Sequence, residues 1–276
     1  MKKIALLGAG GKMGMRLTRN LVNSTYETSY CEISEPGIAK LQEFNLMPTD
    51  ASKAVPQADI VVLAVPDVIL GKVSQQTIPL MKKGAMVFTL DPAAAQAGLL
   101  EPRKDLAYFV AHPSHPSVFN WEDNEKAQRD YFGGTLAKQT VVCALMAGKE
   151  EDYFTGEALA KTIYAPVSKA FRITVKQMAL LEPALVETLS STCLAIVREG
   201  LNEIISRGVT EEAAREFLYG HMNIQLAVLF DQIPGAVFSD AANKAIVRGK
   251  RVLFRDDWKM IFEDDNLQEQ IRDIIS

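Results

Sequence analysis

The sequence predicts an α/β protein in which a mostly parallel sheet is followed by an all-α C-terminal domain. Three observations carry this prediction. Short apolar runs recur through the first 150 residues, stretches of helical periodicity separate them, and from residue 173 onward the helical pattern dominates. Runs that are apolar throughout are typical of strands buried on both faces, and parallel strands need helical crossovers between them.

The strand candidates are short, and most of them end at a polar or turn residue. They cover residues 4–7, 28–33, 60–65, 85–90, 108–111 and 140–145, and residues 169–175 are the candidate for a last edge strand. A helix is expected over residues 13–22, directly after the first strand. Glu35, Pro36 and Gly37 indicate a turn after the second strand.

Helical periodicity begins just before residue 150 and, after the edge-strand candidate, dominates to the end of the chain. Pro166 stops the first helical stretch, and Gly208 suits the end of a long helix in which Pro183 should cause a kink or mark the true start. Thr210 and the acids after it predict the start of a further helix. The helical stretches cover residues 150–164, 176–207, 210–231, 240–247 and 267–275.

These patterns divide the chain into residues 1–172 and residues 173–276. A helical segment of this size, with one long central helix, rarely closes a core alone. We therefore expect a homodimer in which the helical domains cover each other. The alternative is that the helical segment folds back onto the first domain.

The composition excludes several classes of protein. Of 276 residues, 48% are hydrophobic and 23% are charged, which argues against a disordered chain. The net charge of −4 argues against a nucleic-acid partner held through phosphate neutralisation. Apart from the N-terminus, the longest apolar run is residues 60–65, which is too short to span a bilayer, so no membrane partner is expected.

The cysteines and the N-terminus both favour a cytoplasmic protein. Cys31, Cys143 and Cys193 are widely spaced, and no two of them form a CxxC pair. This odd set fits free thiols in a reducing compartment better than disulfides or a zinc site. The N-terminal apolar run stops at Gly8, too early for the core of a signal peptide.

A glycine-rich turn follows the first strand and opens the first helix. Its candidate cofactor-binding residues are Gly8, Gly10, Gly11, Lys12, Met13 and Gly14. Such a turn lets the backbone approach a pyrophosphate, whose charge is stabilised by unpaired N–H groups at the helix N-terminus. The run therefore predicts a Rossmann-type dinucleotide-binding domain over residues 1–172. The alternative is a glycine turn that only packs a helix against a strand.

Glu32 indicates which dinucleotide binds. It lies near the end of the second strand, where an acid accepts hydrogen bonds from ribose hydroxyls and repels a 2′-phosphate. No basic residue follows it before Lys40, so NAD is favoured over NADP. Pro66, directly after the third apolar run, is expected at the same ligand-binding edge. The alternative for Glu32 is a solvated strand end.

Several runs together resemble a known superfamily. The segments "IALLGAGGKMG", "ADIVVLAVPD" and "KKGAMVFTLD", followed by a helical domain, resemble the 6-phosphogluconate and β-hydroxyacid dehydrogenases. More narrowly, "HPSHPSVF", "QMALLEPALVET" and "GHMNIQLAVLF" resemble a phosphogluconate-dehydrogenase-like branch that includes D-apionate oxidoisomerases. The spelling GKMG and the later His-Pro are also similar to prephenate dehydrogenases. Residues 173–276 are therefore expected to form a helical domain for substrate binding and dimerisation.

Two of the three histidines are candidates for acid–base catalysis. His112 and His115 follow the strand candidate 108–111, at the edge where parallel sheets bind ligands, and prolines stiffen their loop. A neutral imidazole suits removal of a hydroxyl proton as hydride leaves, and His115 is preferred as base or orienter. The alternative is a structural loop whose histidines bond backbone carbonyls.

The residue that the resemblance implies as base is missing. The superfamily's usual base is a lysine on the long helix of the second domain, but Lys176 lies too early, so its role is not carried over. The helix instead offers Glu182 and Glu187 among apolar residues, where an unpaired charge is costly. Both are candidate catalytic residues. The alternative is that they are ordinary helix acids.

His221 and Asn223, after Gly220, are candidate substrate contacts, and the alternative for His221 is a satisfied interior histidine. Glu182, Glu187 and His221 are conceivable ligands of a cation that assists a rearrangement, but their spacing is no known ligand pattern, so no metal is expected.

The sequence therefore predicts an NAD-dependent oxidoreductase that acts on a small polyhydroxy carboxylate. The resemblance adds oxidation of D-apionate coupled to isomerisation. Alternatives are a plain 3-hydroxyacid or prephenate-type dehydrogenase and, in another class, a non-catalytic dinucleotide sensor.

Overall fold

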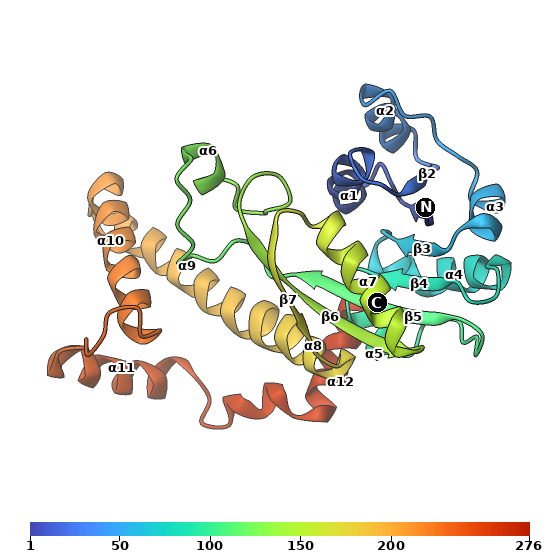
Figure 1. Cartoon of the computed structure of the whole chain (residues 1–276). Coiled ribbons are helices and arrows are strands. Elements are labelled where there is room, and N and C mark those ends of the chain that lie inside the picture. The colour runs from blue at the N-terminus through green and yellow to red at the C-terminus, as the bar shows by residue number, and fades with distance from the viewer. The chain divides into compact units, whose positions relative to one another are not determined.

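The computed structural model describes residues 1–276 (Figure 1). By its internal contacts the chain divides into two compact units. The first is Met1–Pro183 together with Gln268–Ser276, and the second is Ala184–Leu267. The functional division expected between residues 172 and 173 stays a prediction.

A seven-stranded sheet forms the centre of the first unit, in the order β2-β1-β3-β4-β5-β6-β7. The strands are β1 (Lys3–Leu7), β2 (Glu27–Cys31), β3 (Ile60–Leu63), β4 (Met86–Thr89), β5 (Ala107–Pro113), β6 (Gln139–Ala147) and β7 (Val167–Arg172). All neighbouring pairs are parallel except β5 and β6. The predicted mostly parallel sheet is therefore confirmed, with one antiparallel pair beyond the dinucleotide-binding half.

Helices cover both faces of this sheet, as parallel connections require. The helices before residue 180 are α1 (Lys12–Val22), α2 (Glu35–Glu43), α3 (Ala51–Ala54), α4 (Asp67–Thr77), α5 (Ala93–Gln96), α6 (Glu125–Gln128), α7 (Glu150–Ile163) and α8 (Val175–Ala179). One core packs α1 and α7 against side chains such as Phe88 and Phe109. A second core includes residues of α3, α4, α5 and α8.

The prediction of a turn after β2 is wrong, because α2 begins there. The Ser34 hydroxyl accepts a hydrogen bond from the Gly37 N–H and so caps the helix. Pro36 stands in the first turn, where its missing N–H and fixed φ suit a helix start. The proline and glycine that suggested a turn therefore belong to a helix N-terminus.

The long helix expected over residues 176–207 is present as three consecutive segments. After α8 come a π-helical segment, η3 (Leu180–Ser191), and α9 (Thr192–Ser206). Pro183 lies inside η3 and does not begin the helix. Because proline cannot donate the usual helical hydrogen bond, a locally wider helix is a recognised response at such a position.

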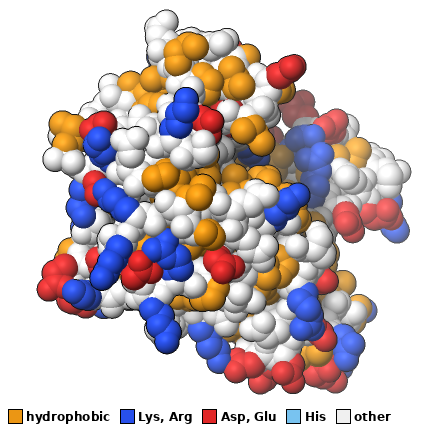
Figure 2. Space-filling model, turned by 90° about the vertical axis from the view of Figure 1, so that its right-hand side faces the viewer, with side chains coloured by type: hydrophobic (Ala, Val, Ile, Leu, Met, Phe, Trp, Pro, Cys, Tyr) orange, Lys and Arg blue, Asp and Glu red, His pale blue; other side chains and the backbone are white.

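The remaining helices are α10 (Glu211–Leu229), α11 (Asp240–Leu253), a short 3-10 turn η4 (Trp258–Phe262) and α12 (Asp264–Ile275). These elements confirm the helical C-terminal region. The three cysteines are all free, as expected. On the face shown in Figure 2, lysine and arginine side chains lie among aspartates and glutamates.

One helical stretch, Val175–Ser206, is long and apolar enough to cross a membrane by length and composition alone. Its best window has a mean hydropathy of 1.5, and only 11% of that window is buried. A single such helix is weak evidence for a membrane span. The same exposed apolar side chains are what a protein–protein contact needs.

The strand order shows at which edge of the sheet a ligand is expected to bind. From β1 the chain moves to β2 on one side, and then crosses to β3 on the other side of β1. Connections therefore diverge at the carboxyl ends of β1 and β3, where open α/β sheets bind their ligands.

Candidate functional site

The glycine turn has no room for side chains. An added Cβ at Gly8, whose φ is +78°, would lie 2.3 Å from the Ala64 carbonyl oxygen, and one at Gly14 would lie 1.9 Å from the Gly8 oxygen. At Gly10 it would lie 2.3 Å from the Gly37 oxygen. Glycine is therefore required for steric reasons at each of these positions, and the backbone is open to close approach by a ligand.

The N-terminus of α1 can receive an anion. Gly11 is the N-cap and no side chain caps the helix. The backbone N–H groups of Lys12, Met13 and Gly14 have no partner in the chain. These three groups, with the helix dipole, form the kind of site that binds a pyrophosphate. The Gly10 N–H is not available for this purpose, because it donates to Glu32.

The Glu32 carboxylate is held in one orientation at the end of β2. Its Oε1 accepts from the Ile33 N–H at 2.9 Å, the Ser34 N–H at 2.8 Å and the Ser34 hydroxyl at 2.9 Å. Its Oε2 accepts only from the Gly10 N–H, at 2.9 Å. Burial alone would raise the pKa of Glu32, but the hydrogen bonds from Ser34, Ile33 and Gly10 lower it below its usual value. The carboxylate is therefore ionised, and Oε2 keeps an acceptor position for a ribose hydroxyl.

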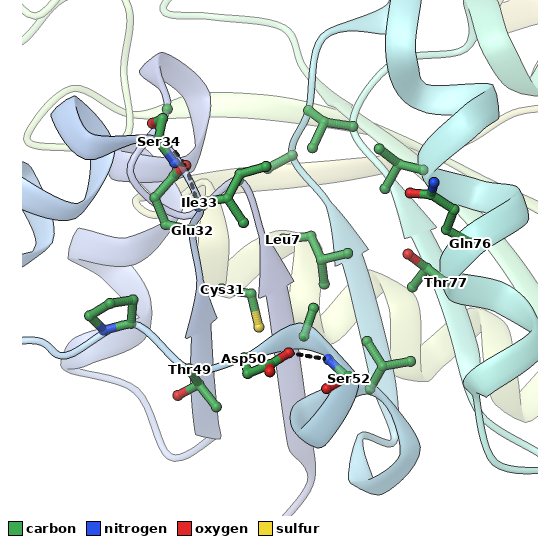
Figure 3. A pocket seen from close by; sticks show the side chains of 18 of the residues that line it. Leu7, Cys31, Glu32, Ile33, Ser34, Thr49, Asp50, Ser52, Gln76 and Thr77 are labelled. Atoms are coloured by element: carbon green, nitrogen blue, oxygen red, sulfur yellow. Dashed lines mark hydrogen bonds between the residues drawn. The ribbon is translucent and has the colours of Figure 1, made fainter.

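A cavity of about 1010 Å³ lies beside this carboxylate. Its lining includes Gly8, Gly11, Glu32 and Pro66, four of the candidate cofactor-binding residues. Figure 3 shows Glu32 and Ser34 at the end of β2, with Gln76 and Thr77 on α4 across the cavity. The lining is mainly apolar, as an adenine ring requires, and the cavity is large enough for half a dinucleotide. Its residues therefore fit NAD.

A second group of polar side chains lies at the carboxyl ends of β4 and β5. Asp91 follows β4, His112 stands in β5, and Glu182 belongs to η3 within the first compact unit. His112 Nε2 is 3.0 Å from Glu182 Oε2, and His112 Nδ1 is 2.8 Å from the Leu90 carbonyl oxygen. Because a carbonyl oxygen only accepts, Nδ1 carries a proton and Nε2 faces the carboxylate.

The electrostatics of this group are dominated by negative charge. Burial alone would lower the pKa of His112, but Glu182, Asp91 and the Leu90 carbonyl raise it above its usual value. Burial raises the pKa of Asp91, and Glu182 adds to that effect. Burial and the charge of Asp91 raise the pKa of Asp67, the first residue of α4, to about 6. The His112 imidazole is therefore the one basic side chain paired with these carboxylates.

His115 lies beside this group. Its ring centroid is 6.3 Å from that of His112, and its Nδ1 is 2.8 Å from the Phe132 carbonyl oxygen. That contact fixes Nδ1 as the protonated nitrogen and leaves Nε2 as a lone-pair acceptor. Its φ of 59° is uncommon for a residue other than glycine. The Arg16 guanidinium lies 4.0 Å from the centroid of the Phe132 ring, so this loop is anchored on α1.

The other candidates lie in the second unit. Glu187 is exposed, and its five-residue spacing from Glu182 matches the hydrogen-bond repeat of a π-helix, in which both residues stand. His221 is exposed, bonds the Phe217 carbonyl within α10 and stacks on the Phe217 ring. Asn223 is exposed on the same helix. The roles proposed for these three residues stay predictions.

Sequence reasoning missed Asp67 and Asp91 as site residues. Both lie within four residues of the end of a buried strand, in the segments ending in "VPD" and "TLD". An acid after each of two neighbouring parallel strands is a signal that could have placed them at one edge of the sheet.

Comparisons with known proteins agree with this geometry. A family model described as acetohydroxy acid isomeroreductase, NADPH-binding domain, matches residues 1–126. One described as phosphogluconate dehydrogenase (decarboxylating) C-term matches residues 120–275.

Curated relatives cover the whole chain. A protein from Cupriavidus necator named D-apionate oxidoisomerase is 54% identical over 99% of both chains. One of the same name from Rhizobium rhizogenes is 48% identical over 99% of this chain and 100% of the relative. A solved structure described as a semialdehyde dehydrogenase NAD-binding protein from Cupriavidus necator, in complex with calcium and NAD, is 53% identical. It covers 99% of each chain with a TM-score of 0.97.

Proposed function

Because this chain belongs to the family of D-apionate oxidoisomerases, we propose that it oxidises D-apionate with NAD and isomerises the product. The observation that carries this proposal is the 54% identity over 99% of both chains. The family also confirms the predicted superfamily, the predicted enzyme class and NAD as the cofactor.

The chemistry of D-apionate explains why oxidation and isomerisation go together. D-apionate is a 2,3-dihydroxy acid whose C3 carries two hydroxymethyl groups and no hydrogen. The secondary alcohol at C2 can therefore lose a hydride, whereas the tertiary alcohol at C3 cannot. The product is a 2-oxo-3-hydroxy acid, in which a carbon group on C3 can migrate to C2.

The chain's residues suit the binding of NAD, which accepts the hydride. The free N–H groups at the start of α1 hold the pyrophosphate, and Glu32 Oε2 accepts from a ribose hydroxyl. A 2′-phosphate in that position would face an ionised carboxylate, which favours NAD over NADP. The cofactor-binding set is therefore the glycine turn with Lys12 and Met13, together with Glu32 and Pro66.

The histidine loop handles the proton. We assign the C2 hydroxyl proton to His115, whose Nε2 is left as a lone-pair acceptor by the contact of Nδ1 with Phe132. His112 and Glu182, held together at 3.0 Å, contact the substrate oxygens. Glu187 remains a candidate catalytic residue, and His221 and Asn223 remain candidate substrate contacts.

A second copy of this chain covers the exposed apolar helices of the second unit in the proposed homodimer. Large hydrophobic side chains are exposed along α9 and α10, and such a surface in water favours association. They include Leu194, Ile196, Val197, Ile204, Phe217, Ile224 and Leu229. Light scattering at micromolar concentration should give twice the chain mass, and a monomer would refute this part. A cytoplasmic location remains part of the proposal, based on the free cysteines.

The test of the function combines turnover with analysis of the product. NADH absorbance should rise when the protein, NAD and D-apionate are mixed, and carbon NMR should show a rearranged skeleton. If the final product is a simple 2-oxo acid, the protein is a plain dehydrogenase that oxidises D-apionate without isomerising it. Absence of turnover with intact NAD binding would overturn the proposal.

The role of His115 is tested by His115→Asn. Loss of a general base lowers the rate by about 10² to 10⁴, while NAD binding stays as it was. The matched control is Ser117→Ala in the same loop, since the Ser117 hydroxyl only accepts from the Phe119 N–H. Equal losses in the two variants would contradict the assignment of the base.

A further inference from the structure

We infer that Asp91, His112 and Glu182 form a binding site for one divalent cation of the Mn²⁺ type, which takes oxygen and nitrogen ligands together. Each residue offers one ligand atom, and these atoms all lie within 4.8 Å of one another. The three side chains are partly buried, with exposed fractions of 25%, 16% and 21% respectively. They are therefore not a loose group of surface acids.

The hydrogen-bond pattern favours a cation between His112 and Glu182. The Leu90 carbonyl fixes the proton on Nδ1, so a neutral His112 presents a lone pair on Nε2. Glu182 Oε2, 3.0 Å away, also presents lone pairs. Two acceptors at this distance repel each other unless a proton or a metal ion lies between them. The arrangement in which Nδ1 bonds a carbonyl and Nε2 is free is also common among metal-ligating histidines.

Charge balance favours a metal ion over a proton. Asp67, Asp91 and Glu182 act on one another electrostatically, and none of them forms an ion pair with a lysine or arginine. Protonation of His112 adds one positive charge against three carboxylates. A divalent cation adds two, and it can contact the Asp91 and Glu182 oxygens directly.

The distance between two of the three ligand atoms suits an octahedral ion. Neighbouring ligand atoms at metal–ligand distances of about 2.1 Å are about 3.0 Å apart, which is the distance between His112 Nε2 and Glu182 Oε2. Carboxylates suit Mg²⁺, Ca²⁺ and Mn²⁺, whereas imidazole suits the transition metals. Mn²⁺ accepts both ligand types, so it is the natural probe.

The site also deepens the proposed function, and this part of the inference rests on that function. In the 2-oxo-3-hydroxy acid, the C3 hydroxyl gives its proton to a base. The bond from C3 to a hydroxymethyl carbon breaks, and its electron pair forms a bond to C2. The C2 carbonyl pair moves onto oxygen, which gains a proton, while C3–O becomes the new carbonyl. Nothing is oxidised or reduced in this step, and a cation stabilises the charge on the two adjacent oxygens.

The experiment measures binding of Mn²⁺ alone by the loss of its free EPR signal, on the full chain with NAD bound. Asp91→Asn and Glu182→Gln keep the size of each side chain and remove a charged ligand. In Asp91→Asn the side-chain oxygen can still accept the hydrogen bond that the Ala93 N–H donates to Asp91 Oδ1. The matched control is Asp105→Asn, just before the opposite end of β5, where Asp105 pairs with Arg103.

We expect one Mn²⁺ per chain in the wild type and in Asp105→Asn, and binding at least about tenfold weaker in each of the two ligand variants. Circular dichroism and NAD binding identify any variant that is misfolded. If one ligand variant is misfolded, Mn²⁺ binding by the other ligand variant tests the inference. Wild-type protein that binds no Mn²⁺, or ligand variants that bind it as tightly as Asp105→Asn, would overturn the inference.

These results are separable from the proposed function. If D-apionate and NAD give NADH while Mn²⁺ does not bind, the cation site fails and the oxidation stands. If Mn²⁺ binds with the expected variant pattern but D-apionate gives no NADH, the site stands and the proposed substrate fails.

Discussion

Replacement of Glu32 by glutamine tests how the chain holds NAD. The wild-type carboxylate uses Oε1 for three donors and Oε2 for the Gly10 N–H, which leaves one acceptor position on Oε2. A glutamine side chain has a single oxygen. If that oxygen takes the Oε1 position, the amide NH₂ faces both the Gly10 N–H and the ribose hydroxyl.

The magnitude follows from these contacts. A hydrogen bond to a charged acceptor contributes about 1.5–3 kcal/mol, so loss of the ribose contact weakens NAD binding by about 10- to 150-fold. The unpaired Gly10 N–H costs about 1–3 kcal/mol of folding free energy, since its partner is removed while the turn stays packed.

The assay is a titration of Glu32→Gln with NADH, followed by fluorescence, together with thermal unfolding. Ser34→Ala is the matched control, because it removes one donor to Oε1 and the cap of Gly37 but leaves Oε2 untouched. Loss of that cap lowers stability by about 0.5–2 kcal/mol. The reasoning is refuted if Ser34→Ala weakens NADH binding as much as Glu32→Gln does.

Two further predictions concern stability. Gly14→Ala places a Cβ 1.9 Å from the Gly8 oxygen and should lower the free energy of unfolding by about 1–3 kcal/mol or more, measured by thermal unfolding. The control is Gly249→Ala, which has open space around it and should stabilise α11 by about 0.5–1 kcal/mol. Asp67 has a folded pKa of about 6, above its usual 3.8, so the stability that this one carboxyl group contributes is fully present below pH 4 and is lost as pH rises through 6. After discounting for solvent screening, Asp67→Asn should be more stable than wild type by about 1–2 kcal/mol at pH 8 and by none at pH 4; parallel melting curves across this range would contradict the shift.

Most of the fold could be predicted from periodicity because the strands are buried on both faces. Residues 60–65 and 85–90 contain β3 and β4, whose side chains are all buried. The start of α2 was missed because Pro36 and Gly37 are local signals shared by turns and helix N-termini. The π-helical segment could not be predicted, since it depends on how the chain accommodates Pro183.

The candidate site was predictable only in part, because some of its residues are close in sequence and others are far apart. The glycine turn and Glu32 are recognisable because each belongs to a local strand–turn–helix pattern. Asp91, His112 and Glu182 come from three separate elements, so no spacing along the chain connects them. Their proximity follows from strand register and from the path of η3, which only the three-dimensional structure supplies.

Glu182 stands on the helix where the resemblance implied a lysine, and this exchange reverses the charge beside His112. A lysine at this position would pair with Asp91 and supply the positive charge that we assign to a cation. Glu182→Lys should therefore abolish Mn²⁺ binding and keep NAD binding, because the glycine turn and Glu32 are untouched. If the cation drives the rearrangement, the NADH that this variant forms from D-apionate, at a rate lowered by the lost substrate contact, should be accompanied by the 2-oxo acid without rearrangement. Carbon NMR of the product decides the point, and a fully rearranged product from Glu182→Lys would show that the rearrangement does not depend on this carboxylate.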